Sequence, residues 1–157
     1  MIIKVSIDAS GGDHGIPVTI EAGIKALGVF QDLQLTFVGD QPTIEAEINK
    51  HPSSKALASR IQVVHATEVV LMNESPAIAL RKKKDSSMRV AINLVESNQV
   101  DACVSAGNTG ALMAISRFVL KTIKGIDRPA IMGRMPTMTG HTHMLDLGRS
   151  EERRVGK

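Results

Sequence analysis

Residues 101–111 of this chain, DACVSAGNTGA, combine a short apolar run, a turn of small residues and the start of a helix. The run at 101–105 has the length of a buried strand, and residues 109–123 repeat apolar side chains at helical spacing. Gly107 and Asn108, which separate them, are residues typical of turns and helix caps. This succession of strand, turn and helix is the building unit of a parallel α/β sheet.

The same alternation recurs on the N-terminal side of this stretch and again after it. Pro17 and Pro42 are expected at first helical positions, and Thr109 is expected to cap the helix that follows residue 105. The pattern predicts a doubly wound α/β fold with a mostly parallel sheet, without internal repeats. Strands are expected at 2–8, 33–39, 61–65, 101–105 and 142–147 with a weaker one at 128–134, and helices at 17–29, 42–50, 86–98 and 109–123.

Composition limits the classes of protein that remain. The 157 residues are 43% hydrophobic and 22% charged, which is ordinary for one globular domain, and only 2% are aromatic, too few for the stacking platforms of RNA-binding sheets. The net charge of +3 falls to +1 when residues 149–157 are set aside. A single cysteine, Cys103, cannot form an intramolecular disulfide, and we find no signal peptide or membrane span, so we expect a cytoplasmic protein.

A glycine-rich turn follows the first expected strand. Gly11 and Gly12 permit close approach of the backbone to a ligand, and the next helix start offers N–H groups to an anion. Asp8 and Asp13 flank the glycines and are suited to orienting the loop, binding a cation or moving a proton. His14 is the one histidine retained as a site candidate, because the five histidines form no metal cluster. A plain tight turn with a helix cap explains the pattern equally well, and the GxGxxG fingerprint of nicotinamide sites is missing.

The turn after residue 105 has the composition of a phosphate or oxyanion cradle. Small residues with hydroxyl and amide groups at a helix N-terminus favour negative charge through the backbone N–H groups and the helix dipole. Simple capping by Asn108 and Thr109 is the structural alternative. Ser105 lacks the GxSxG elbow of a nucleophile, and Cys103 is expected to be a small core residue.

The third feature is the run of four cations from Arg81 to Lys84, which precedes Ser86 and Ser87. Such a run attracts phosphate or an acidic protein, although a solvated basic face is the ordinary interpretation. The rest of the body has balanced charge, so nucleic-acid binding is not expected.

Together these segments resemble the PlsX family, the bacterial phosphate acyltransferases of phospholipid synthesis. The resemblance rests on residues 8–17, 81–87 and 105–111, with further matches at 39–40, 126–130 and 145–148. It implies a Rossmann-like three-layer α/β/α fold related to isocitrate and isopropylmalate dehydrogenases. It also implies formation of acyl phosphate from acyl-[acyl carrier protein] and inorganic phosphate by a homodimer. We expect no cofactor and assign no metal ligand. Peripheral membrane association and a membrane glycerol-3-phosphate acyltransferase as partner are further implications.

Under this resemblance, Asn108, Lys84 and Asp13 are the expected catalytic residues. Direct attack of a phosphate oxygen on the thioester carbonyl needs no covalent intermediate on the enzyme. The expected phosphate-binding and substrate-binding residues come from the same three segments: Gly11, Gly12, His14, Arg81, Lys82, Lys83, Ser86, Ser105, Gly107, Thr109 and Gly110.

Two departures from the family pattern stand out. Ser10 occupies a place where the family usually has Met, and residues 149–157 do not resemble the family. We therefore expect residues 1–148 to be the N-terminal part of the acyltransferase α/β domain, followed by an unrelated tail. A phosphotransacetylase-like or dehydrogenase-like relative, and an inactive fragment that binds the carrier protein, are the alternatives.

Overall fold

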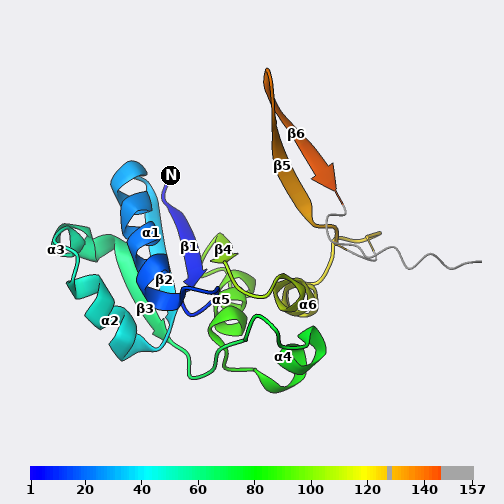
Figure 1. Ribbon diagram of the computed structural model, residues 1–157, viewed down its shortest axis with the longest axis horizontal. Coiled ribbons are helices and arrows are strands. Elements are labelled where there is room, and N and C mark those ends of the chain that lie inside the picture. The colour runs from blue at the N-terminus through cyan, green and yellow to red at the C-terminus, as the bar shows by residue number, and fades with distance from the viewer. Residues whose placement is uncertain (127–128, 146–157) are drawn as a thin grey trace, which may run out of the picture. The chain divides into compact units, whose positions relative to one another are not determined.

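The computed structural model describes residues 1–126 and 129–145, which divide into two compact units, the first covering Met1–Lys121 and the second beginning at Thr122. The first unit is an α/β domain (Figure 1). Its strands are β1 (Ile3–Asp8), β2 (Leu33–Gly39), β3 (Ile61–His65) and β4 (Ala102–Ser105). Its helices are α1 (Gly15–Val29), α2 (Gln41–Asn49), α3 (Ser54–Leu57), the short 3₁₀ helix η1 (Ala58–Arg60), α4 (Pro76–Lys82), α5 (Ser87–Glu96) and α6 (Thr109–Leu120).

The four strands form one parallel sheet in the order β3-β2-β1-β4. The chain therefore moves outward from β1 through β2 to β3 and then returns to the other side of β1. Side chains alternate across the sheet, so that Ile7 and Phe37 face one core cluster while Val38 faces another. The predicted α/β class with a parallel sheet is confirmed.

Helices cover both faces of this sheet. Ile20, Ile24 and Leu27 of α1 pack with Ile7 and Phe37 on one face. On the opposite face, α5 packs against β1, β2 and β4. Burial of these aliphatic side chains stabilises the domain by about 25 cal/mol per Å² of apolar surface, and it fixes the three layers from which the loops at the sheet edge project.

The second unit contains an antiparallel hairpin of β5 (Met132–Thr137) and β6 (Gly140–Leu145). The strands predicted at 128–134 and 142–147 overlap this hairpin, but these segments pair with each other and not with the parallel sheet. Part of both predictions, and the whole of the predicted tail at 149–157, lies outside the described residues.

Within the first unit, all four predicted helices are present with small shifts of their ends. Sequence patterning did not predict α3, η1 and α4, which are each seven residues or shorter. The cap of α6 is Asn108 and not Thr109, because the Asn108 side chain accepts the hydrogen bond from the N–H of Ala111. In the described part of the chain, no helix is long and apolar enough to cross a membrane.

Candidate functional site

The carboxyl ends of β1 and β4 define the candidate site. Asp8 and Ser105 are register partners at the last positions of these two parallel strands. The chain leaves β1 toward β2 on one side of it, whereas β4 lies on the other side of β1. The loops that follow β1 and β4 therefore lead in opposite directions. In doubly wound sheets, ligands bind in the crevice created at such a switch point.

Asp8 is the buried centre of this edge. Its side chain is 1% exposed, and its two carboxylate oxygens accept hydrogen bonds from the Ser87 hydroxyl at 2.6 Å and the Ser105 hydroxyl at 2.7 Å. Ser87 is the first residue of α5, so the positive end of the α5 dipole also favours the carboxylate. The Ser105 hydroxyl in turn accepts the N–H of Gly107 at 3.1 Å. One carboxylate thus connects β1, α5 and the loop after β4.

Glycines allow the two loops to come together above Asp8. A Cβ added to Gly11 would lie 2.5 Å from Oδ2 of Asp8 and 3.1 Å from the backbone nitrogen of Gly107. Gly12 has φ of +88°, and a Cβ there would lie 3.2 Å from the backbone oxygen of Ala106. The sequence prediction that Gly11, Gly12 and Gly107 share one site is therefore consistent with their placement.

Backbone donors surround this junction at the starts of two helices. Among the described residues, the N–H groups of Gly12 and Asp13 before α1, and of Thr109 and Gly110 in the first turn of α6, have no hydrogen-bond partner. α6 begins three residues after Ala106, which Gly12 contacts. Free N–H groups and helix dipoles at one edge are the usual chemistry of an anion site.

Asn108 is occupied by protein partners. Its amide nitrogen lies within hydrogen-bond distance of the carbonyl oxygens of Leu71, Met72 and Glu74, at 3.3, 3.0 and 2.9 Å, while its amide oxygen caps α6. The side chain therefore fixes residues 71–74 against the start of α6. This arrangement matches the capping alternative, and it makes Asn108 a residue that orients the free N–H groups of Thr109 and Gly110.

The basic run lies outside the loop junction. Arg81 and Lys82 end α4, Lys83 donates to the Val69 carbonyl at 3.2 Å, and Lys84 is exposed. Ser86 is buried, and its hydroxyl donates to the Lys83 carbonyl and caps α5 through the N–H of Arg89. The Ser86 hydroxyl therefore serves the turn, and it is its neighbour Ser87 that contacts Asp8.

Asp85, which follows the basic run, stabilises the same turn. The hydroxyl and N–H of Thr67 hydrogen-bond its carboxylate and hold the pKa of Asp85 below its ordinary value. The carboxylate of Glu68 accepts the N–H of Asp85 at 3.1 Å. These contacts leave Lys84 at the exposed tip of a fixed turn.

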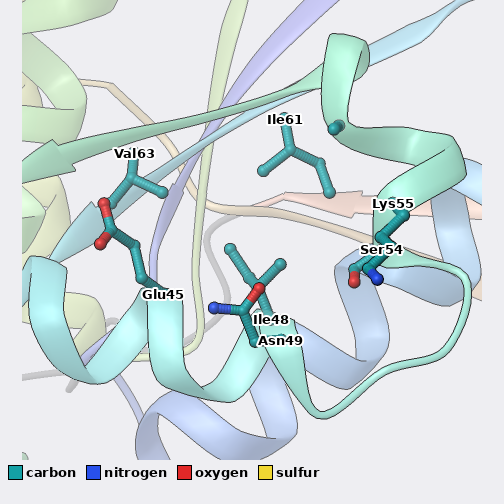
Figure 2. Close-up of a pocket in the computed structure, with 8 residues that line it drawn as sticks. Glu45, Ile48, Asn49, Ser54, Lys55, Ile61 and Val63 are labelled. Carbon is teal, nitrogen blue, oxygen red and sulfur yellow. The ribbon is translucent and has the colours of Figure 1, made fainter.

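Two hollows flank the sheet. One, of about 390 Å³, is lined by Gly11–Gly15, including the exposed Asp13 and His14, and by Ile7, Val18 and Val104. The other, of about 350 Å³, lies between α2, α3 and β3, where the side chains of Ile48, Ile61 and Val63 face the space (Figure 2). The first hollow adjoins the loop junction, whereas the second contains none of the predicted site residues.

The Cys103 thiol is not activated, and two histidines of the second unit pack against each other. Burial, together with the nearby negative charge of Asp8, raises the pKa of the Cys103 thiol to about 11. His141 and His143 pack edge to face in the hairpin, with ring centroids 5.1 Å apart. No group of three or more metal-binding side chains occurs in the part of the chain that the structure describes.

Sequence reasoning gave Asp8 several possible roles but did not include Asp8 or Ser87 among the expected site residues. The signal for Asp8 was present, since a carboxylate at the end of an apolar strand is a candidate for a buried network. The signal for Ser87 was weaker, because a serine pair before a helix suggests capping alone. Only the packing of α5 against β1 brings Ser87 to Asp8.

Comparison with known proteins identifies the family of the chain. A family model described as "Fatty acid synthesis protein" matches residues 3–155. The chain is 78% identical to the phosphate acyltransferase of Vesicomyosocius okutanii and 80% identical to that of Ruthia magnifica, in each case over 148 residues. The phosphate acyltransferase of Hydrogenovibrio crunogenus is 57% identical over the same length. Each match covers 94% of this chain and 43% of the relative, so the chain spans less than half the length of these relatives.

Proposed function

The chain belongs to the fatty acid synthesis protein family, together with these phosphate acyltransferases, and we propose that it supplies the phosphate-binding part of an acyl-[acyl carrier protein]:phosphate acyltransferase. The observation that carries the proposal is the junction of the β1–α1 and β4–α6 loops. There, the two loops meet above the hydrogen-bonded carboxylate of Asp8, and each leads into a helix start with free backbone N–H groups. The product, acyl phosphate, would serve phospholipid synthesis.

The reaction suits a site of this kind. An oxygen of hydrogen phosphate attacks the thioester carbonyl carbon, the C–S bond breaks, and the departing sulfur of the carrier protein takes up the proton that the phosphate loses. Charge develops on the carbonyl oxygen during the attack, and fixed N–H donors stabilise it without reorganising. The N–H groups of Thr109 and Gly110 are the proposed donors to phosphate or to this oxyanion, with Gly11 and Gly12 lining the opposite wall.

The side chains divide into those that orient and those that approach substrate. Asn108 orients the start of α6, since its amide is bound to residues 71–74. Asp13 lies exposed beside the glycines, where a carboxylate is suited to accept a proton. Lys84 and its neighbours Arg81 and Lys82 contribute positive charge that draws phosphate or the acidic carrier protein toward the site.

The family resemblance also suggests the assembly, the location and the partner of the enzyme. A homodimer in the cytoplasm, peripheral association with the membrane and delivery of acyl phosphate to a membrane glycerol-3-phosphate acyltransferase are all included in the proposal. Because the chain spans 43% of its relatives' length, an inactive fragment that still binds the carrier protein is the second candidate.

The test is acyl phosphate formation by a full-length fusion. Residues 1–148 are joined to the remaining C-terminal residues of the Ruthia magnifica phosphate acyltransferase and assayed with acyl-[acyl carrier protein] and phosphate. We expect activity, with a loss of at least roughly tenfold, about 1.4 kcal/mol of transition-state stabilisation, for Lys84→Ala and for Asn108→Ala. Lys55→Ala, an exposed lysine on α3, is the matched control and retains full activity.

The outcomes separate the candidates. Turnover of acyl-CoA in preference to the carrier-protein thioester would favour a phosphotransacetylase-like enzyme. Wild-type rates for both Lys84→Ala and Asn108→Ala would remove the assigned site. Activity of the fusion but not of the 157-residue chain would identify the chain as the fragment form.

A further inference from the structure

Charge is distributed unevenly over the first unit. Residues 76–96 and 109–121, which contain α4, α5 and α6, carry seven Lys or Arg residues and two acidic residues, Asp85 and Glu96. Residues 15–60, which contain α1 to η1, carry four Lys or Arg residues and five acidic residues. The positive charge of the domain is therefore concentrated on the three helices that adjoin the candidate site.

These helices form one packed group. Ala79 of α4, Met88 and Ile92 of α5 and Ile115 of α6 share a buried cluster. α6 contacts both α4 and α5, and α5 also contacts β4 (Figure 1). The outward sides of these helices therefore belong to a single surface, which begins at the first turn of α6, where the free N–H groups of Thr109 and Gly110 lie.

An exposed aromatic side chain lies at the far end of α6. Phe118 is 53% exposed, and the guanidinium carbon of Arg89 and the ammonium nitrogen of Lys121 lie 5.2 and 4.8 Å from its ring centroid. Lys121 also donates to the Phe118 carbonyl at 2.7 Å. We call Arg89, Phe118 and Lys121 the basic aromatic patch.

The backbone at this patch is strained. Lys121 has φ of +66° and ψ of −171°, a conformation that side-chain-bearing residues rarely adopt. This conformation occurs at the residue whose ammonium group covers the Phe118 ring. Strained backbone concentrates at functional positions, and here it coincides with two cations on one exposed ring.

Resting on the proposed function, we propose that the basic aromatic patch, together with Arg81, Lys82 and Lys84, is the docking surface for the acidic acyl carrier protein. An aromatic ring bordered by cations offers both parts of a protein hot spot, a flat apolar contact and charge that complements an acidic helix. About nine residues of α6 separate Phe118 from Thr109, a rise of roughly 14 Å. A carrier protein bound there lies beside the cradle, so its acyl-bearing arm reaches the proposed phosphate site along α6.

The charge arrangement favours an acidic protein. The carboxylate of Asp85 is engaged by Thr67, and Glu96 lies seven residues beyond Arg89 at the other end of α5. No acidic residue occurs in α4 or α6. Among residues 76–96 and 109–121, Asp85 and Glu96 are therefore the only carboxylates that would oppose a partner with an acidic helix.

The test measures binding of purified acyl carrier protein to the full 157-residue chain by calorimetry at low and at physiological salt. We expect Phe118→Ala and Lys121→Glu each to weaken binding at least tenfold, and affinity to fall as salt rises. Phe30→Ala is the matched aromatic control, since Phe30 is 56% exposed but lies in residues 15–60, where acidic residues outnumber basic ones. Lys55→Glu, in the same segment, is the control for charge. Both controls bind as the unmodified chain does.

Unchanged carrier-protein affinity in both patch variants overturns the proposal, as does failure of the unmodified chain to bind. Binding of phosphatidylglycerol vesicles that is lost in the same variants, without carrier-protein binding, would assign the surface to lipid instead. Circular dichroism of Lys121→Glu, whose side chain is exposed, checks the fold, and we expect the spectrum of the unmodified chain. Phosphate binding at the loop junction is measured separately. If the unmodified chain fails to bind phosphate, the proposed function is contradicted, whereas failure of the unmodified chain to bind the carrier protein contradicts only the docking surface.

Discussion

The Asp8 network yields a quantitative prediction about stability. Asp8→Ala removes both hydroxyl hydrogen bonds and leaves Ser87 and Ser105 without their acceptor, whereas Ser87→Ala removes one bond from a buried carboxylate. Hydrogen bonds to charged groups contribute about 1.5–3 kcal/mol each. We expect Ser87→Ala to destabilise the chain by about 2 kcal/mol and Asp8→Ala by about 4 kcal/mol, a large part of the 5–15 kcal/mol typical of a domain.

The two substitutions should not add. Once Asp8 is alanine, removal of the Ser87 hydroxyl costs almost nothing, so the double-mutant cycle should give a coupling of about 1.5–3 kcal/mol. The free energy of unfolding is measured by urea titration followed by far-ultraviolet circular dichroism, because the chain has no Trp or Tyr. Ser54→Ala, a buried serine on α3, is the control, and its effect should add to that of Asp8→Ala. Coupling below about 0.5 kcal/mol between Asp8 and Ser87 would refute the network.

Three further predictions follow from single sites. Gly11→Ala should destabilise the folded chain by about 1–3 kcal/mol, because the added methyl group clashes with Asp8. Gly28→Ala lies in α1 with open space around it and should stabilise the chain by about 0.5–1 kcal/mol. Equal effects of the two substitutions on the free energy of unfolding would contradict the loop geometry. Cys103 should react with iodoacetamide roughly 100-fold more slowly than free cysteine at pH 8, with a rate that rises until about pH 11; a plateau near pH 9 would be inconsistent with its burial. Arg60→Ala should destabilise by about 2 kcal/mol, since its guanidinium donates at 2.8 Å to the carbonyls of Leu27 and Phe30, and Arg60→Lys should restore little of this in the same urea titration.

The sequence predicted the parallel sheet well because its strands are short aliphatic runs whose neighbours repeat at helical spacing. The bounds of β2 and β3 agree with the prediction residue for residue. The hairpin was harder, because residues 132–145 carry no pattern that distinguishes pairing with each other from pairing with the main sheet. α4 was missed because its seven residues are too few for helical periodicity to emerge.

The candidate site shows a similar division. Gly11, Gly12 and Gly107 could be predicted from composition, because adjacent glycines after a strand indicate close backbone contact. The partners of Asn108 could not, since they are carbonyl oxygens more than 30 residues away along the chain. Likewise, the hydrogen bond from Ser87 to Asp8 joins residues 79 positions apart and depends on how α5 packs on the sheet.

The proposed function depends on phosphate binding at the junction of the β1–α1 and β4–α6 loops. Titration of the ¹⁵N-labelled chain with inorganic phosphate, followed by amide chemical shifts, tests it most directly. We expect saturable shifts of the Gly12, Thr109 and Gly110 amides, with the Gly28 amide unchanged as the internal control. Shifts confined to the Arg81–Lys84 run, or none at any of these amides, would contradict it.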